Sequence, residues 1–258
     1  MKNKYVILID VDGTLVESGK TEVCKTVIDS LKYAKQQGNI LAIATGRSVN
    51  TTLNVDCYNI FNYIACLMGS VIYSVKENKI IYEDENKINN QYIKPLIEHF
   101  INSGKEWTYK DDKEDKSTMD INNCGNRFNA KIVSKETVFE DIKNNKIFQL
   151  LACEEIVDNS IKEKFTDLDF VLMPDNYYDI LKKGNSKAKT VKYFKEKFPE
   201  YKIVAIGDSN NDIPMLKTAD ISIAMGNADK NVKDLCKYQT KTLKEDGVSY
   251  AIKEILKI

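Results

Sequence analysis

The chain has 258 residues, 43% hydrophobic and 29% charged, which is ample for a hydrophobic core in one large domain or two smaller ones. Its 38 Lys and Arg residues balance 38 Asp and Glu residues, so a broad basic surface for nucleic acid or an anionic membrane is not expected. No apolar run approaches the roughly 20 residues that a membrane span needs. The six cysteines are scattered without a CxxC pair, so we expect free thiols, no zinc site and a cytoplasmic location.

Short apolar runs alternate with helical patterns in the first third of the chain. The runs at 5–9, 40–44 and 63–67 are nearly continuous, as in strands that are buried on both faces of a parallel sheet. Apolar residues between 23 and 34 recur at helical spacing, and Gly38 follows where a helix C-cap is expected. A β-hairpin is predicted over 71–83.

The middle of the chain is more polar and mixes both kinds of element. A helix is predicted around 88–100, and strands are predicted at 127–133, 146–152, 169–173 and 177–181. The charged stretch 111–116 is interpreted as a solvated loop. The only histidine, His99, falls within the helical pattern, so Ser-His or Cys-His catalysis has little support.

The last part returns to the first pattern, with apolar runs at 202–206 and 221–225 between helical stretches near 191–198 and 248–255. The sequence therefore predicts an α/β fold with a doubly wound, Rossmann-like parallel sheet. We expect residues 1–83 and 183–258 to form this core and residues 84–182 to form an inserted α+β domain.

Polar clusters follow three of the predicted core strands. They are Asp10-Val11-Asp12-Gly13-Thr14, Thr45-Gly46-Arg47 and Gly207-Asp208-Ser209-Asn210-Asn211-Asp212. Ligands of open parallel sheets bind at the carboxyl ends of the strands, so these clusters are expected to meet.

Four acids at one sheet edge repel one another unless a cation lies between them, and Mg²⁺ is a cation that binds few carboxylates while keeping waters and phosphate oxygens. Each Asp alone fits the capping of a turn or helix equally well. Thr45 and Gly46 suit a phosphate, and Lys187 could neutralise its charge, although each signal alone is weak. Neither a Walker A sequence nor GxGxxG is present.

Taken together, the first two clusters, Lys187 and the last cluster resemble the four motifs of the haloacid dehalogenase superfamily, in order. The place of the insertion resembles the Cof-type branch, which carries a type IIB cap, and the stretches 206–228 and 245–248 are similar to that branch. Two departures stand out: Met68-Gly69-Ser70 replaces the usual Asn-Gly-Ala, and Ala188 replaces the usual Gly after the lysine.

The resemblance implies a phosphatase that hydrolyses a small phosphorylated metabolite, such as a sugar phosphate or a phosphorylated cofactor. By position, Asp10 would be the nucleophile that forms an aspartyl-phosphate, and Asp12 the acid and base. Mg²⁺ would bind Asp10, the backbone carbonyl of Asp12, and Asp208. Phosphate would be held by Thr45, Gly46, Lys187 and Asn211. Asp212 would support the residues that surround the metal and the phosphate.

Two other functions are compatible with the sequence. A phosphomutase or phosphotransferase of the phosphomannomutase type has a similar first motif and an insertion in the same place. A non-catalytic ligand-binding module is disfavoured because the nucleophile, acid/base, lysine and metal carboxylates are all present. The sequence leaves the substrate and the oligomeric state open.

Overall fold

The computed structural model describes residues 4–85, 87–118, 130–173 and 176–258. Its contacts divide the chain into two compact units. Unit 1 comprises Met1–Arg47, Thr51–Glu83 and Ser186–Ile258, and unit 2 comprises Ser48–Asn50 and Asp84–Asn185. Among the described residues, no helix is both long and apolar enough to cross a bilayer.

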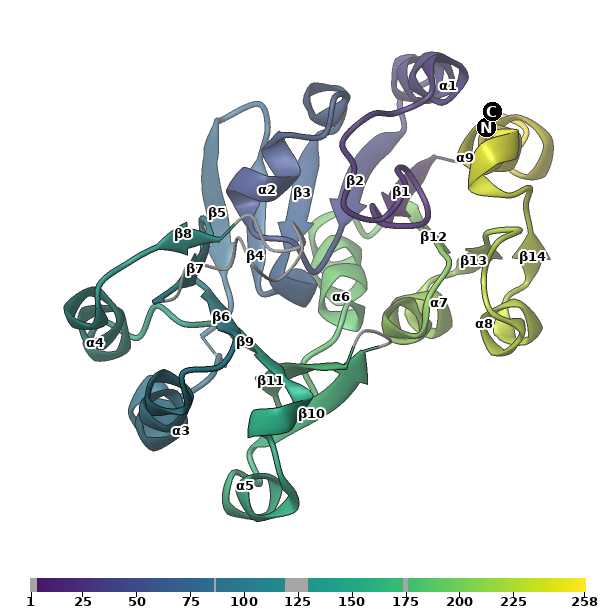
Figure 1. Cartoon of the computed structure of the whole chain (residues 1–258). Coiled ribbons are helices and arrows are strands. Elements are labelled where there is room, and N and C mark those ends of the chain that lie inside the picture. Colours follow the sequence, from purple (N-terminus) through teal and green to yellow (C-terminus); the bar gives the residue numbers. More distant parts are fainter. Residues whose placement is uncertain (1–3, 86, 119–129, 174–175) are drawn as a thin grey trace. The chain divides into compact units, whose positions relative to one another are not determined.

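Unit 1 is built on an eight-stranded sheet in the order β14-β13-β12-β1-β2-β3-β4-β5 (Figure 1). The strands from β14 to β3 are parallel, and β4 and β5 extend the sheet as an antiparallel hairpin. Strand β1 lies at the centre and every residue in it is buried, because both faces are covered. The strands are β1 (Tyr5–Ile9), β2 (Ile40–Ala44), β3 (Tyr63–Cys66), β4 (Val71–Ser74), β5 (Lys79–Glu83), β12 (Lys202–Gly207), β13 (Ile221–Ala224) and β14 (Tyr238–Gln239).

Helices cover both faces of this sheet (Figure 1). Helices α1 and α9 pack together, and the hydroxyls of Ser30 and Ser249 lie 2.7 Å apart between them. Helices α6 and α7 pack together and against β12. This arrangement confirms the predicted doubly wound α/β core. The helices are α1 (Lys25–Gln36), α2 (Val49–Leu53), α6 (Ala188–Lys197), α7 (Ile213–Thr218), α8 (Lys230–Leu235) and α9 (Gly247–Tyr250), which continues as a π-helical turn over Ala251–Ile255.

Unit 2 contains a six-stranded sheet in the order β10-β11-β9-β6-β7-β8. All neighbouring strands pair antiparallel except β7 and β8. Of the predicted strand 127–133, residues 127–129 lie outside the described residues. The elements are α3 (Asn90–Ser103), β6 (Trp107–Lys110), β7 (Asp115–Ser117), β8 (Lys131–Ile132), α4 (Lys135–Lys143), β9 (Gln149–Cys153), α5 (Asn159–Lys164), β10 (Leu168–Met173) and β11 (Tyr177–Lys182).

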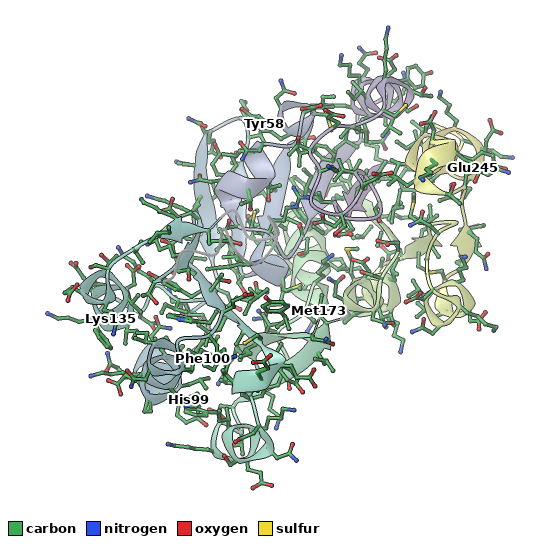
Figure 2. The ribbon with its side chains drawn as sticks, viewed as in Figure 1. Tyr58, His99, Phe100, Lys135, Met173 and Glu245 are labelled. Atoms are coloured by element: carbon green, nitrogen blue, oxygen red, sulfur yellow. The ribbon has the colours of Figure 1, made fainter. Side chains whose placement is uncertain are left out.

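Apolar side chains from α3 and α4 form one core with alternate residues of β6, β9 and β11. Helix α3 begins at the cap residue Asn89, whose side chain accepts hydrogen bonds from two backbone N–H groups, and ends at Gly104 with φ 64°. His99 lies on α3 beside Phe100 (Figure 2), and its Nε2 is 3.2 Å from the carbonyl oxygen of Ile156. The histidine therefore has the helical position that the sequence predicts.

The interpretation of 111–116 as a solvated loop is wrong. These residues form the turn between β6 and β7 and the first part of β7, and two of their charged side chains are buried. Lys116 Nζ lies 2.7 Å from Asp111 Oδ2 and 2.8 Å from Asp141 Oδ2. Charged side chains can be buried when each has a partner of opposite charge, so a run of charged residues does not by itself indicate exposure to solvent.

We expect Lys116→Met to lower the free energy of unfolding by about 3 kcal/mol, because it leaves the Asp111 and Asp141 carboxylates buried without their cation. The matched control is Lys131→Met on the neighbouring strand, where the lysine is 62% exposed and pairs with Glu114. That control should cost about 0.5 kcal/mol or less. Urea denaturation measures both, and equal losses would contradict a structural role for the buried pair.

Candidate active site

The first cluster follows directly from the end of the central strand β1. Asp10 is 4% exposed, and Asp12 is two residues further on. Between the strand and Thr14 the chain turns tightly through Gly13, which has φ +83°. A Cβ at Gly13 would lie 2.2 Å from Asp208 Oδ2, so only glycine allows the backbone to approach this carboxylate.

Lys187 lies one residue before α6 and is 1% exposed. Its Nζ is 2.5 Å from Asp10 Oδ1 and 2.7 Å from Asp212 Oδ1. Burial alone would lower the pKa of Lys187, but the charges of these two aspartates outweigh burial and raise it above the ordinary value. The lysine is therefore a fixed cation that joins residues from β1 and from the loop after β12.

The loop after β12 is held by Asp212, which is fully buried. Its Oδ2 accepts hydrogen bonds from the backbone N–H groups of Asp208 and Ser209 at 3.0 and 3.1 Å. A Cβ at Gly207 would lie 2.6 Å from the Asp212 carboxyl group, so the last residue of β12 must be small. Both oxygens of Asp212 thus already accept hydrogen bonds from the protein.

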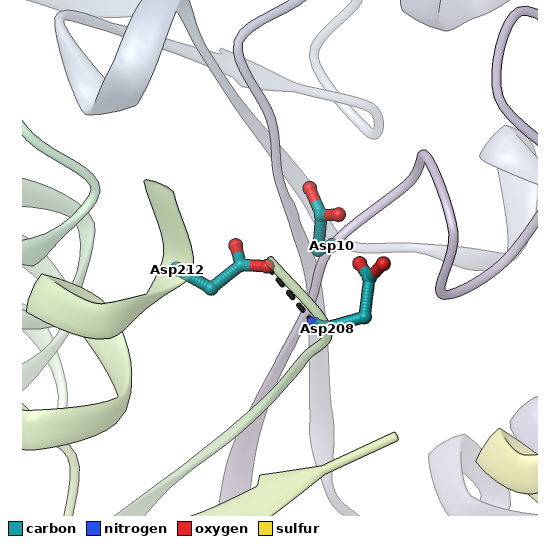
Figure 3. Close-up of side chains that lie close together, drawn as sticks. All are labelled: Asp10, Asp208 and Asp212. Carbon is teal, nitrogen blue, oxygen red and sulfur yellow. Dashed lines mark hydrogen bonds between the residues drawn. The ribbon is translucent and has the colours of Figure 1, made fainter. Parts of the chain in front are cut away.

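Carboxylate oxygens of Asp10, Asp208 and Asp212 lie within 4.8 Å of one another (Figure 3). Three carboxylates and the single ammonium of Lys187 leave two negative charges, which a divalent cation would balance. Because Asp212 is saturated by Lys187 and the two backbone N–H groups, Asp10 and Asp208 have the better-placed oxygens for a cation. The donor set consists of hard oxygen ligands and fits a divalent metal of the magnesium type.

The pKa shifts of the acids reflect this excess of negative charge. Burial and the neighbouring Asp212 raise the pKa of Asp10 well above its ordinary value, although Lys187 opposes the shift. Burial, followed by the charge of Asp212, raises the pKa of Asp208 to about 6. Without a further cation, both carboxylates are therefore less acidic than free aspartate.

Asp12 has a different environment from the other acids. Its carboxylate accepts two hydrogen bonds from Arg47, from Nε at 2.9 Å and from Nη2 at 2.7 Å, and a third from the Gly19 N–H at 2.9 Å. Burial would raise the pKa of Asp12, but the hydrogen bonds and charge of Arg47 lower it overall. Asp12 is thus ionised, and its side chain is oriented by a residue from the loop after β2.

Thr45 and Gly46 follow β2, next to the end of β1 in the sheet. The Thr45 side chain is buried, and its Oγ1 accepts a hydrogen bond from the Arg47 N–H at 3.1 Å. The Thr45 carbonyl accepts from the Met68 N–H at 3.1 Å. Leu67 and Met68 both adopt left-handed backbone angles, with φ 52° and 58°, so the predicted strand 63–67 ends at Cys66.

The Met68 thioether lies against Gly46. A Cβ on Gly46 would be 3.0 Å from Met68 Cε. The first departure from the usual family sequence therefore places a buried, apolar side chain beside the expected phosphate-binding turn, where an amide is usual.

The structure brings together Asp10, Asp208, Asp212 and Lys187, and it places Asp12 in contact with Arg47. Asn211 is exposed, and its Oδ1 accepts a hydrogen bond from Ser209 Oγ at 2.9 Å. Two contacts were not assigned from the sequence. Thr14 Oγ1 donates to Asp208 Oδ1 at 3.1 Å, and Arg47 pairs with Asp12. Both residues lie inside the motifs, but only the structure shows which atoms they contact.

Residues 7–252 match the family model described as haloacid dehalogenase-like hydrolase, and the chain belongs to this family. It is 26% identical to the 5-amino-6-(5-phospho-D-ribitylamino)uracil phosphatase YcsE of Bacillus subtilis, over 96% of this chain and 94% of that protein. It is also 26% identical to a phosphoglycolate phosphatase of Methanobrevibacter smithii, over 98% and 99% of the two chains.

Among solved structures, the sugar phosphatase BT4131 of subclass IIB superposes with a TM-score of 0.78 at 23% identity, covering 99% of this chain and 100% of that one. The predicted resemblance to the haloacid dehalogenase superfamily is confirmed, and the fold matches that of this subclass IIB protein. The protein is accordingly a phosphatase of this family.

We expect Mg²⁺ to stabilise the protein more at pH 7.5 than at pH 5. Between pH 3.8, the ordinary pKa of an aspartate, and about pH 6, the raised pKa means that Asp208 holds a proton in the folded protein but not in the unfolded chain. In that window a cation must displace this proton, and Asp10, whose pKa is also raised, can hold a second one, so the Kd for Mg²⁺ should weaken at least about tenfold per pH unit below about 6. Thermal denaturation with and without Mg²⁺ measures this effect. The control Asp208→Asn should show little Mg²⁺-dependent stabilisation, and a stabilisation that does not change with pH in the unmutated protein would contradict the assignment.

Proposed function

We propose that the protein hydrolyses a phosphate monoester of a small metabolite through an aspartyl-phosphate on Asp10, with Mg²⁺ as cofactor. The observation that carries the proposal is the position of Asp10, which lies at the end of the central strand, in contact with Lys187 and beside Asp208. A nucleophilic carboxylate divides a difficult displacement into two easier steps. The names of the relatives support a small, phosphorylated substrate, such as a sugar phosphate or a phosphorylated cofactor.

In the first step, an Asp10 carboxylate oxygen attacks phosphorus, the bond to the ester oxygen breaks, and Asp12 gives its proton to the leaving oxygen. In the second step, Asp12 takes a proton from water, the water oxygen attacks phosphorus, and the bond to Asp10 breaks. One ester and one water thus yield an alcohol and inorganic phosphate. Lys187, Thr45 and Gly46 would hold the transferring phosphoryl group, with Asn211 at the rim of the site.

Asp10, Asp208 and the backbone carbonyl of Asp12 would hold Mg²⁺, while Asp212 would orient Lys187 and the loop that carries Asp208. When bound, the ion supplies positive charge that offsets the negative charge of the phosphoryl group. The excess of two negative charges around Lys187 supports a divalent ion at this place.

The contact between Asp12 and Arg47 suits one half of the reaction. It keeps Asp12 deprotonated, as the second step requires, whereas the first step requires the protonated acid. A dianionic phosphate ester attracts Arg47 and raises the pKa of a nearby carboxyl group. We infer that substrate binding loosens this ion pair and allows Asp12 to carry a proton.

We propose that unit 2, which contains most of the predicted insertion 84–182, determines the leaving group. The residues that would carry the phosphoryl chemistry all belong to unit 1. An inserted domain with its own sheet and core can vary in its surface without disturbing that chemistry.

Asp10→Asn should abolish Mg²⁺-dependent release of phosphate from p-nitrophenyl phosphate, because an amide is a poor nucleophile. Asp12→Asn should lower turnover by about 10²- to 10⁴-fold, as expected when a general acid and base is lost. Phosphate release is measured colorimetrically, and the matched control is Asp56→Asn, an exposed acid of unit 1. Turnover by Asp10→Asn at the unmutated rate would refute the mechanism.

Arg47→Met should move the acidic limb of the pH–rate profile of the second step to higher pH. The hydrogen bonds of Arg47 lower the pKa of Asp12, and without them burial raises it. At mildly acidic pH more Asp12 is then protonated and unable to act as the base. Stopped-flow measurement of the rate at which phosphate is released during the first turnover reports this second step. Arg47→Lys, which keeps the charge but not the two-point contact, should shift the limb less. An unchanged pH profile in both variants would show that Arg47 does not control Asp12.

A further inference from the structure

Three consecutive residues after β3 have left-handed backbone angles. Leu67, Met68 and Gly69 have φ of 52°, 58° and 84°, and all three are buried. Glycine adopts this conformation freely, but a residue with a side chain does so at a steric cost. Two such residues in succession persist only where the surrounding structure holds them, and backbone strain of this kind is concentrated at functional sites. We call Leu67–Gly69 the left-handed turn.

The left-handed turn holds the backbone of the loop after β2. The Met68 N–H donates to the Thr45 carbonyl at 3.1 Å. The Leu67 N–H donates to the Arg47 carbonyl, also at 3.1 Å. A peptide unit is planar, so a fixed Thr45 carbonyl also fixes the direction of the Gly46 N–H. The left-handed turn therefore sets the orientation of peptide groups in the segment that would hold the phosphoryl group.

The last residue of the left-handed turn lies against the start of α6. A Cβ on Gly69 would be 2.6 Å from Thr190 Oγ1 and 2.9 Å from the Thr190 nitrogen, so glycine is needed for this close approach. The Thr190 N–H in turn donates to the Lys187 carbonyl at 3.1 Å. The left-handed turn thus connects two parts of unit 1 that would hold the phosphoryl group, the loop after β2 and the residue before α6.

The Met68 side chain fills the space beside Gly46. Gly46 is not in the left-handed region, so its backbone conformation does not itself require glycine. Among the described atoms outside its chain neighbours, those within 4 Å of a Cβ on Gly46 would be Met68 Cε at 3.0 Å and Met68 Sδ at 3.8 Å. An apolar thioether therefore packs against this side of the glycine. Removing it would give the most flexible type of residue room to move.

We propose that Met68 is a positioning residue, which holds Gly46 and the Thr45 carbonyl in the arrangement that binds phosphate. This inference rests on the proposed phosphatase function, in which Thr45, Gly46 and Lys187 hold the phosphoryl group. The Met68 N–H fixes one peptide group, and its thioether limits the movement of the glycine. Less conformational freedom is then lost when phosphate binds, which strengthens binding.

Met68→Ala should raise the Kd for inorganic phosphate roughly tenfold in the presence of Mg²⁺, because phosphate must then order Gly46 as it binds. Isothermal titration calorimetry measures this Kd, and the Ki of phosphate against hydrolysis of p-nitrophenyl phosphate gives an independent value. Met68→Leu, which nearly conserves the side-chain volume, should raise the Kd by about threefold or less. If Met68→Ala does not fold, Met68→Gly tests the same loss of the thioether without the steric cost of the left-handed backbone.

The matched control is Met225→Ala. Met225 is fully buried in unit 1, and a Cβ on Gly247 would be 2.8 Å from Met225 Cε, so this thioether also packs against a glycine. Met225→Ala should lower Tm because it leaves a cavity, but it should not change the Kd for phosphate.

A double-mutant cycle separates the contact between Met68 and Gly46 from a general loss of packing. Gly46→Ala places a methyl group 3.0 Å from Met68 Cε, so it should lower kcat/KM for p-nitrophenyl phosphate. In the Met68→Ala background this methyl group has space, and the further loss caused by Gly46→Ala should be roughly tenfold smaller. Equal losses in both backgrounds would mean that the methyl group obstructs phosphate directly, and the inference would be overturned.

The remaining outcomes separate this inference from the proposed function. If phosphate binds equally well to the unmutated protein and to Met68→Ala, or if Met225→Ala weakens binding as much, Met68 has no positioning role. If phosphate binding responds to Met68→Ala as expected but no phosphate ester is hydrolysed, the positioning role is supported and the proposed function is refuted.

Discussion

The ammonium group of Lys187, buried between Asp10 and Asp212, is the interaction on which the candidate site depends. It joins a residue at the end of β1 to the loop after β12, which are 177 and 25 positions away from the lysine in the chain. A buried cation is tolerated only with paired anions, and these anions are tolerated only with the cation. The three side chains therefore fix one another, and Asp212 in turn fixes the backbone that carries Asp208.

The central parallel sheet makes this convergence possible. Strands β12, β1 and β2 are neighbours, so the residues that follow them meet at one edge. Two glycines leave the space that these carboxylates occupy. A side chain at Gly13 would collide with Asp208, and one at Gly207 would collide with Asp212. The remaining charge is two units negative, which supports a divalent cation. Asp12 does not add to this excess of negative charge because Arg47 neutralises it. Asp10 and Asp12, two residues apart, therefore have pKa shifts in opposite directions.

Much of the fold could be predicted from the sequence, because β1, β2 and β12 are continuous apolar runs and the residues after them are polar. Prediction from the sequence fails where the burial or the contacts of a residue depend on a partner far away in the chain. The run 111–116 is charged, yet Lys116 is buried because Asp141, 25 residues away, accepts from it. Likewise, the sequence contains Arg47 and Thr14, but it does not show that their partners are Asp12 and Asp208.

The central claim is that Asp10 itself carries the phosphoryl group during turnover. The most direct measurement is mass spectrometry of the protein quenched in acid during steady-state hydrolysis with Mg²⁺, followed by proteolysis. The account predicts one added phosphoryl group on the peptide that contains Asp10, lost on treatment with hydroxylamine and absent without substrate. A phosphorylated peptide elsewhere in the chain, or full turnover with no covalent phosphate under conditions that trap acyl phosphates, would contradict it.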